Sequence, residues 1–454
     1  MSQVGAVVVA SGEQNLPVRR SVRRSVSSIS WSATGAVAAP FSQAIGSFVL
    51  QFLALRYLGI EGFGAYALLF GVIVVATSIV SGLIGDSLTV LDRSDPSIRA
   101  GLQAWLAFTA GGLALTLALG AWASGRLTGP QSAALGACTA VFLVEDALRR
   151  MLMASMRFWS LVVVDITGLV VAVGIVVAAH ATAGGATLST FIVALAVGQM
   201  CASVVAVTRL ASSDQWVARG VRPDVAAVWN YGSWRAFQQV LRPSMLTGVR
   251  VIVTVVVSLA VFGELEAARL YVAPAMLVVG GVASYLFVSY ARDRTTPLGS
   301  LRRRADRTVV VLSAATLALG VVATALVPLL GELFTDDANE LDQITVFGWS
   351  AYAAATAAVT PFGSLAAVRG RQAAVLAIRS VESLASILLV LFVLTSGGSV
   401  VLVPFVLAVV AGVSGLAMRL LLLDTNEVPG PAGEFVSVGF PMALSPVNWS
   451  GGQR

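Results

Sequence analysis

Three arginines interrupt an otherwise apolar stretch at residues 232–260: Arg235, Arg242 and Arg250. Successive residues of an α-helix are about 100° apart, so steps of seven and eight residues keep all three side chains within roughly an 80° stripe. A charge at the centre of a lipid-facing helix costs about 2.5–3.5 kcal/mol on insertion scales. The stripe therefore predicts a ladder of guanidinium groups that lines a polar cavity or meets acidic partners. A guanidinium group can bind two phosphate oxygens at once through two parallel hydrogen bonds.

Few acidic residues within the apolar stretches can balance this ladder. Asp86 and Asp165 lie near the predicted cytoplasmic ends of their spans, and we expect them to neutralise Arg235 when the cavity closes on that side. Arg379 and Glu382 are one helical turn apart within a later span. The sequence is compatible with two roles for them, a buried structural ion pair or an ion pair that opens during gating. These four residues are therefore candidates for gating or charge balance.

A second acidic pair follows a local pattern. Glu145 and Asp146 precede Arg149 and Arg150 by four residues each. On a helix this spacing places each acid beside its arginine. We expect local ion pairs with a structural role.

The remaining residue types exclude several classes of chemistry. All 29 basic residues are arginine, so the lysine of a Walker A motif, of a Schiff base or of a pyridoxal anchor is missing. There is one histidine, His180, at the predicted outer end of a span, and the two cysteines, Cys138 and Cys201, lie in apolar runs, so the sequence predicts neither a metal site nor a disulfide. We expect no cofactor, no nucleic-acid partner and no ATP hydrolysis. The longest predicted outer loop, 332–343, is also too short for a membrane glycosyltransferase or ligase, so an enzyme is not expected.

Composition determines the class of protein that must position these residues. Of the 454 residues, 57% are hydrophobic and 11% are charged, against about 45–50% and about 25% in soluble proteins. A membrane span needs about 20 apolar residues. Twelve stretches reach that length, which predicts an all-α polytopic membrane protein with spans near 31–55, 65–91, 100–123, 131–148, 158–181, 188–210, 232–260, 267–290, 308–331, 344–367, 372–395 and 400–422.

Arginine is distributed unequally between the two sides of these spans. Most arginines fall in segments that share a side with the N-terminus, whereas the loop after the ninth span is acidic. Cytoplasmic loops retain positive charge. We therefore expect a multi-pass protein of the cell (plasma or inner) membrane with both termini in the cytoplasm.

The chain divides into two similar halves. An offset of about 203 residues brings Trp31 onto Trp234 and Pro40 onto Pro243, and with small insertions Leu58-Gly59 onto Phe262-Gly263. Six spans per half predict parallel repeats with a binding site between them. The expected organisation is two pseudo-symmetric six-helix lobes around a central cavity: a disordered basic tail at 1–30, an N-lobe at 31–210, an interfacial linker at 211–231, a C-lobe at 232–423 and a second tail at 424–454.

One motif resembles a known family. The segment Arg56-Tyr57-Leu58-Gly59, followed by Phe63-Gly64-Ala65-Tyr66, resembles the pattern after the first helix of the polysaccharide (O-antigen, lipid-linked oligosaccharide) flippases. These belong to the multidrug/oligosaccharidyl-lipid/polysaccharide exporter superfamily. A weaker resemblance covers Arg149 to Phe158 and the two-lobed layout. The absence of lysine departs from the usual members.

The resemblance implies an alternating-access flippase that moves a polyprenyl-pyrophosphate-linked oligosaccharide, a cell-surface polysaccharide precursor, to the outer leaflet. By role, Arg242 and Arg250, with Arg235, would bind the pyrophosphate, and the membrane potential would drive its transfer. The expected partners are the lipid-linked glycan, membrane lipids and a glycan polymerase or glycosyltransferases of the same pathway. The alternative is a cation-coupled multidrug or small-molecule antiporter of the same superfamily.

Overall fold

The structure is a computed structural model that describes residues 19–92, 94–125, 127–210, 220–293, 296–329 and 341–423. Over these residues every regular element is a helix, which confirms the all-α prediction. The helices are α1 Arg19–Val80, the π-helix η1 Ser81–Gly85, α2 Asp86–Val90, α3 Pro96–Ala123, α4 Gly129–Ala154, α5 Phe158–Ala183, α6 Leu188–Arg209, α7 Val225–Val256, α8 Leu259–Arg292, α9 Leu298–Ala325, α11 Gln343–Val368, α12 Gln372–Thr395, α13 Leu402–Ala417 and the π-helix η3 Met418–Leu422.

Ten of the described helical segments are long and apolar enough to cross a membrane. The longest, Ala38–Leu88, is broken at Gly59, whose φ of 68° lies in the left-handed region that glycine tolerates best. This break makes two crossings of one segment. Helix α8, which is 34 residues long, is a further long helix outside these ten segments.

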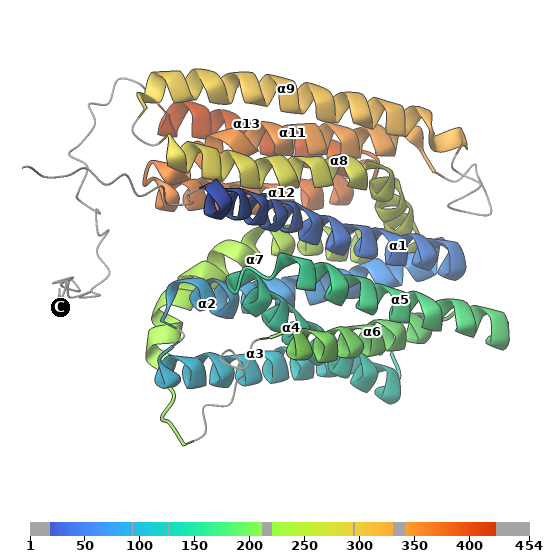
Figure 1. Cartoon of the computed structure of the whole chain (residues 1–454). Coiled ribbons are helices and arrows are strands. Elements are labelled where there is room, and N and C mark those ends of the chain that lie inside the picture. Colours follow the sequence, from blue (N-terminus) through green and yellow to red (C-terminus); the bar gives the residue numbers. More distant parts are fainter. Residues whose placement is uncertain are drawn as a thin grey trace, which may run out of the picture.

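The helices form two lobes. In the N-lobe, α3 packs on α4, α4 on α6 and α5 on α6, whereas in the C-lobe α11 packs against α8, α9 and α13. Figure 1 shows α8, α9, α11, α12 and α13 on one side of the molecule and α2 to α6 on the other. The lobes meet where α1 contacts α7 and α8, and where η1 contacts α7.

We name the two ends of the bundle by the course of the chain. The terminal end is the end where α1 begins and η3 ends, on the left of Figure 1, and the opposite end is the far end. The sequence predicts that the terminal end is the cytoplasmic one.

Several predicted boundaries move. Helix α1 begins at Arg19, so residues 19–30 are helical where a disordered tail was predicted. The predicted linker helix is wrong for residues 220–224, which are not helical, whereas residues 225–231 form the start of α7. The remaining parts of the tails and the linker lie outside the described residues.

Two glycines define the contact between the lobes at the far end. A Cβ added to Gly64 would lie 2.6 Å from the carbonyl oxygen of Leu259, and one added to Gly263 would lie 2.1 Å from that of Ile60. Gly64 and Gly263 are 199 residues apart in the chain, and so are Ile60 and Leu259. Phe63 and Phe262, which precede the two glycines, are both fully buried. The contact is therefore nearly symmetric between the lobes.

This symmetry corrects the predicted register of the repeat. The sequence alignment placed Leu58-Gly59 on Phe262-Gly263, but the structural equivalent of Phe262-Gly263 is Phe63-Gly64. The error arises because Gly59 forms the turn before the second crossing, whereas Gly263 lies inside α8. An alignment of identities cannot separate a turn glycine from a packing glycine.

Candidate functional site

A cavity of about 660 Å³ lies between the two lobes. Its wall is formed by α1, η1, α4 and α5 from the N-lobe and by α7, α8 and α11 from the C-lobe. Ligand sites typically occupy about 300–1,000 Å³. The cavity therefore has the size and the position predicted for a binding site between the two repeats.

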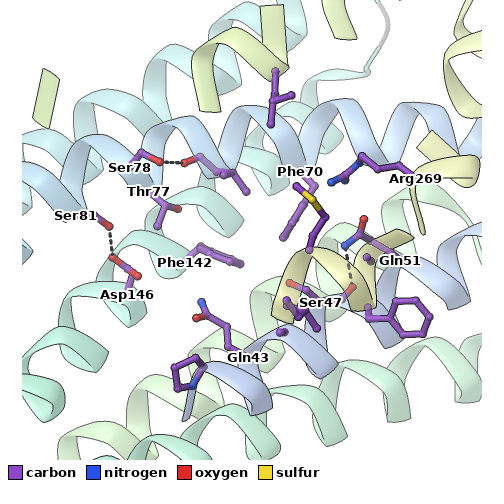
Figure 2. A pocket seen from close by; sticks show the side chains of 18 of the residues that line it. Gln43, Ser47, Gln51, Phe70, Thr77, Ser78, Ser81, Phe142, Asp146 and Arg269 are labelled. Carbon is purple, nitrogen blue, oxygen red and sulfur yellow. Dashed lines mark hydrogen bonds between the residues drawn. The ribbon is translucent and has the colours of Figure 1, made fainter. Parts of the chain in front are cut away.

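Aromatic and uncharged polar side chains form the middle of this cavity. Phe70 and Phe142 approach each other edge-on, with ring centroids 6.1 Å apart. Figure 2 shows them between two polar ends, with Ser81 and Asp146 at one end and Arg269 at the other. Such a site offers apolar surface to the body of a ligand and charge to its extremities.

The C-lobe places three charged residues at the far end of the cavity. Arg250 on α7 donates from Nε to Oε1 of Glu266 on α8 at 3.0 Å, and Arg269 donates to Oε2 of the same carboxylate at 2.8 Å. Arg250 also donates to the carbonyl oxygen of Ala67. Glu266 is almost fully buried. One carboxylate is thus shared by two guanidinium groups, which leaves one positive charge in excess.

The N-lobe supplies charges at the terminal end of the cavity. Arg150 donates to Oδ2 of Asp146 at 2.8 Å, and the hydroxyl of Ser81 donates to the same oxygen at 3.0 Å. Arg150 also donates to the Ser81 hydroxyl. This network connects α4 to η1 and confirms the predicted local pair of Asp146 and Arg150.

Arg149 has two acidic neighbours. It makes two hydrogen bonds to Asp165, at 2.9 and 3.1 Å, and its Nε lies 3.7 Å from Glu145. The Ser42 hydroxyl donates to Asp165 at 2.6 Å. The predicted pair of Glu145 and Arg149 is confirmed, whereas the predicted pairing of Asp165 with Arg235 is wrong because Asp165 faces α4 inside the N-lobe.

The other predicted acid does reach Arg235. Asp86 on α2 accepts a hydrogen bond from Arg235 on α7 at 2.7 Å, and Arg235 also donates to Gln238. Beside this pair, a Cβ on Gly232 would lie 2.3 Å from the carbonyl oxygen of Leu83. The Asp86–Arg235 pair therefore joins the two lobes at the terminal end.

The predicted ladder divides around the cavity. Arg250 lines it, but Arg242 is outside the set of lining residues and lies beside Tyr352 on α11 instead. The two positions are about 80° apart around the helix, which is enough to place one side chain in the cavity wall and the other outside it. Arg379 and Glu382 form the predicted ion pair, 3.2 Å apart, on the same side as Arg242.

Sequence reasoning missed the acid and one arginine of the far-end cluster. Glu266 lies one residue before the predicted eighth span, 267–290, and Arg269 lies at the start of that span without an expected partner. In the structure α8 begins at Leu259, so both residues lie inside the helix. Glu266 and Arg269 are three residues apart, and this spacing was the sequence feature that could have predicted an ion pair on one face of the helix.

The charged residues of the cavity wall are four arginines and two carboxylates: Arg149, Arg150, Arg250, Arg269, Asp146 and Glu266. Arg149 pairs with Asp165, which lies outside the wall, and Arg150 pairs with Asp146, so the unbalanced positive charge belongs to Arg250 and Arg269, which share Glu266. The described residues contain no group of three or more histidine, cysteine, aspartate or glutamate side chains that could hold a metal ion. This arrangement suits an anionic group better than a cationic one.

No family model and no curated protein matches the chain. Solved structures do match it. An inward-facing structure of a multidrug resistance MATE family transporter of the MOP superfamily superposes with a TM-score of 0.65, covers 85% of this chain and 97% of that chain, and is 10% identical. An outward-facing structure of a multidrug resistance MATE family transporter of the MOP superfamily gives a TM-score of 0.55, with 85% and 94% coverage and 12% identity.

A third structure is a MOP superfamily transporter from Pyrococcus furiosus, described as having a binding pocket of reverse polarity. Its TM-score is 0.57, with 85% and 94% coverage and 10% identity. At these identities the likeness establishes the fold. The chain has the fold of these transporters, and these neighbours do not support the polysaccharide flippase subfamily that the sequence motif resembles.

Proposed function

We propose that the chain is an alternating-access membrane transporter for amphipathic molecules that carry an anionic group. The observation that supports this most strongly is the cavity between the lobes, whose charged wall consists of four arginines and two carboxylates around an aromatic middle. A cargo with an apolar body and a negative end matches both features.

Contacts at both ends of the bundle support alternating access. Gly64 and Gly263 bring the lobes into backbone contact at the far end, and the Asp86–Arg235 pair joins them at the terminal end. Structural neighbours have been solved in inward-facing and outward-facing states. Separation of these contacts in turn would expose the cavity to each side.

Two kinds of cargo fit this chemistry. The first is a small amphipathic molecule exchanged in a coupled antiport, which is favoured because the structural neighbours include multidrug resistance transporters. The second is a lipid-linked pyrophosphate glycan. It is favoured by the excess of arginine in the cavity and by the motif from Arg56 to Tyr66.

Transport in proteoliposomes tests the proposal. Fluorescein and rhodamine 6G share a ring system but carry opposite charges, so they isolate the effect of cargo charge. We expect faster transport of fluorescein, a loss of that transport in Arg250→Gln, and normal transport in the control Arg304→Gln, whose arginine pairs with Asp293 outside the cavity. Transport of rhodamine 6G alone would contradict the proposal.

A competitor distinguishes the two kinds of cargo. Farnesyl pyrophosphate carries a short polyprenyl chain on a pyrophosphate. Strong inhibition of fluorescein transport by farnesyl pyrophosphate, but not by farnesol, would favour the lipid-linked cargo. Absence of inhibition would favour the small-molecule antiporter.

A further inference from the structure

Arg250 joins the two lobes from within the cavity wall. Its Nε and Nη2 donate to the Glu266 carboxylate of α8, at 3.0 and 3.3 Å, and its Nη1 donates to the carbonyl oxygen of Ala67 in α1, at 3.3 Å. The side chain is therefore bonded to a carboxylate of its own lobe and to the backbone of the other lobe.

These two partners occupy equivalent places in the two lobes. The offset of 199 residues that relates Gly64 to Gly263 also relates Ala67 to Glu266. Each partner follows its glycine by about one helical turn, towards the terminal end. The bonds of Arg250 therefore lie about one turn from the far-end contact between the lobes.

A second bond joins α7 to α1 beside the first. The Thr247 hydroxyl, about one turn before Arg250, donates to the carbonyl oxygen of Gly71 at 3.2 Å. Gly71 also makes room for the arginine, because a Cβ at this position would lie 2.2 Å from Arg250 Nη1. We call the Arg250–Ala67 and Thr247–Gly71 bonds the far-end latch.

An anion in the cavity competes with Ala67 for the guanidinium of Arg250. A guanidinium donates its N–H bonds in a fixed planar fork. Glu266 takes the donors on Nε and Nη2, so a bidentate anion must use the edge formed by Nη1 and Nη2. Nη1 is the atom that donates to Ala67. An anionic group and the Ala67 carbonyl therefore draw on the same donor atom.

The strengths of the two bonds favour the anion. The Ala67 carbonyl is neutral, and its distance of 3.3 Å from Arg250 exceeds the usual N–H···O distance of about 2.9–3.0 Å. A hydrogen bond to an ionised group is shorter and roughly twice as strong as one between neutral groups. The latch bond is thus the weaker of the two.

We infer that binding of an anionic group to Arg250 releases the far-end latch, so that cargo binding is coupled to separation of the lobes at the far end. The inference rests on the proposed anionic cargo and adds the way in which that cargo opens one side of the transporter. Such coupling is reciprocal, so a change that releases the latch also tightens binding of the anion. One hydrogen bond of ordinary net strength corresponds to about a fivefold change in an equilibrium constant.

Distances between spin labels on the two lobes test this coupling. With Cys138 and Cys201 replaced by alanine, labels on Thr182→Cys in α5 and Ser396→Cys at the end of α12 report the separation of the lobes at the far end. Electron paramagnetic resonance on the purified full-length protein in detergent measures this distance. We expect fluorescein to lengthen it.

Alanine at Gly71 releases the latch while the charge of Arg250 stays in the cavity. The added Cβ displaces only the end of the arginine side chain. Gly71→Ala should therefore lengthen the far-end distance without fluorescein. By fluorescence polarisation it should bind fluorescein about fivefold more tightly than the wild type. The matched control is Gly46→Ala, also in α1, where the nearest atom is 4.0 Å from the added Cβ.

Two further variants distinguish the latch from simple crowding between the helices. Thr247→Val removes the second latch bond at nearly constant size, so it should change both measurements in the same direction without adding bulk. Gly71→Ala combined with Arg250→Gln should bind fluorescein no more tightly than Arg250→Gln alone, because this protein has no arginine to release.

Fluorescein binding to the wild type without a longer far-end distance would overturn the inference and leave the anionic cargo in place. The inference also fails if neither Gly71→Ala nor Thr247→Val tightens fluorescein binding. Absence of fluorescein binding in the wild type would overturn the proposed function itself, together with the coupling that rests on it.

Discussion

Gly64 and Gly263 each lie against the backbone of the other's lobe. The Cβ position of Gly64 is 2.6 Å from the carbonyl oxygen of Leu259, and that of Gly263 is 2.1 Å from the carbonyl oxygen of Ile60. A real Cβ cannot approach a backbone oxygen so closely. The two glycines therefore permit the closest contact between the lobes at the far end, and closure there depends on their lack of a side chain.

Alanine at Gly263 should prevent this closure. We expect Gly263→Ala to reduce transport at least tenfold while the protein remains folded, because the lobes separate by the width of a methyl group. Transport in proteoliposomes and thermal unfolding measure the two quantities. The matched control is Gly112→Ala, where no atom lies within 4 Å of the added Cβ. Equal transport by both variants would exclude a closing contact at Gly263.

Loss of the shared carboxylate should destabilise the far-end cluster. Glu266→Gln leaves Arg250 and Arg269 side by side without their acid. Removing one partner of a buried ion pair typically costs about 3–5 kcal/mol. Thermal unfolding in detergent should show a large decrease in melting temperature.

Arg250→Gln provides the comparison for Glu266→Gln. Glu266 keeps its bond to Arg269 in this variant. The decrease in melting temperature should therefore be clearly smaller. If Arg250→Gln proved the more destabilising change, the shared-carboxylate account would be incorrect.

Exchange of charge between the lobes should preserve the terminal-end contact. Arg235→Asp places two acids together and should reduce transport, and the double variant Asp86→Arg with Arg235→Asp should restore much of it. The effect on folding stability should be below about 1 kcal/mol because the Arg235 side chain is 36% exposed. A double-mutant cycle on transport measures the coupling, and purely additive effects would argue against a functional pair.

Cysteine labelling tests the orientation that the arginine distribution predicts. With Cys138 and Cys201 replaced by alanine, Gly184→Cys at the far end should react with an impermeant maleimide added to intact cells. Leu298→Cys at the terminal end should react only after the cells are opened. The opposite pattern would place the termini outside.

The sequence predicts the fold better than the site, for a physical reason. Long apolar stretches require membrane helices whatever their neighbours, so the membrane helices follow from length and composition. The direction of a side chain within the bundle depends on the neighbouring helices. The 80° between Arg242 and Arg250 decides which of them lines the cavity, and no pattern in α7 alone determines that rotation.

Acids at span boundaries show the same limit. Glu266 joins the cavity because α8 begins eight residues before the predicted span, at Leu259. Asp86 was correctly paired with Arg235, since both lie at the terminal ends of adjacent helices. Asp165 lies near the same end, but the rotation of α5 turns it to Arg149.

The affinity of the purified protein for the two xanthene dyes tests the central claim most directly. Fluorescence polarisation should show fluorescein binding at least tenfold more tightly than rhodamine 6G. The Arg250→Gln variant should bind fluorescein about tenfold more weakly than the wild type, whereas the control Arg304→Gln should bind it as the wild type does. The claim that an arginine-rich cavity between the lobes binds an anionic cargo predicts this order. Equal affinities, or tighter binding of rhodamine 6G, would contradict it.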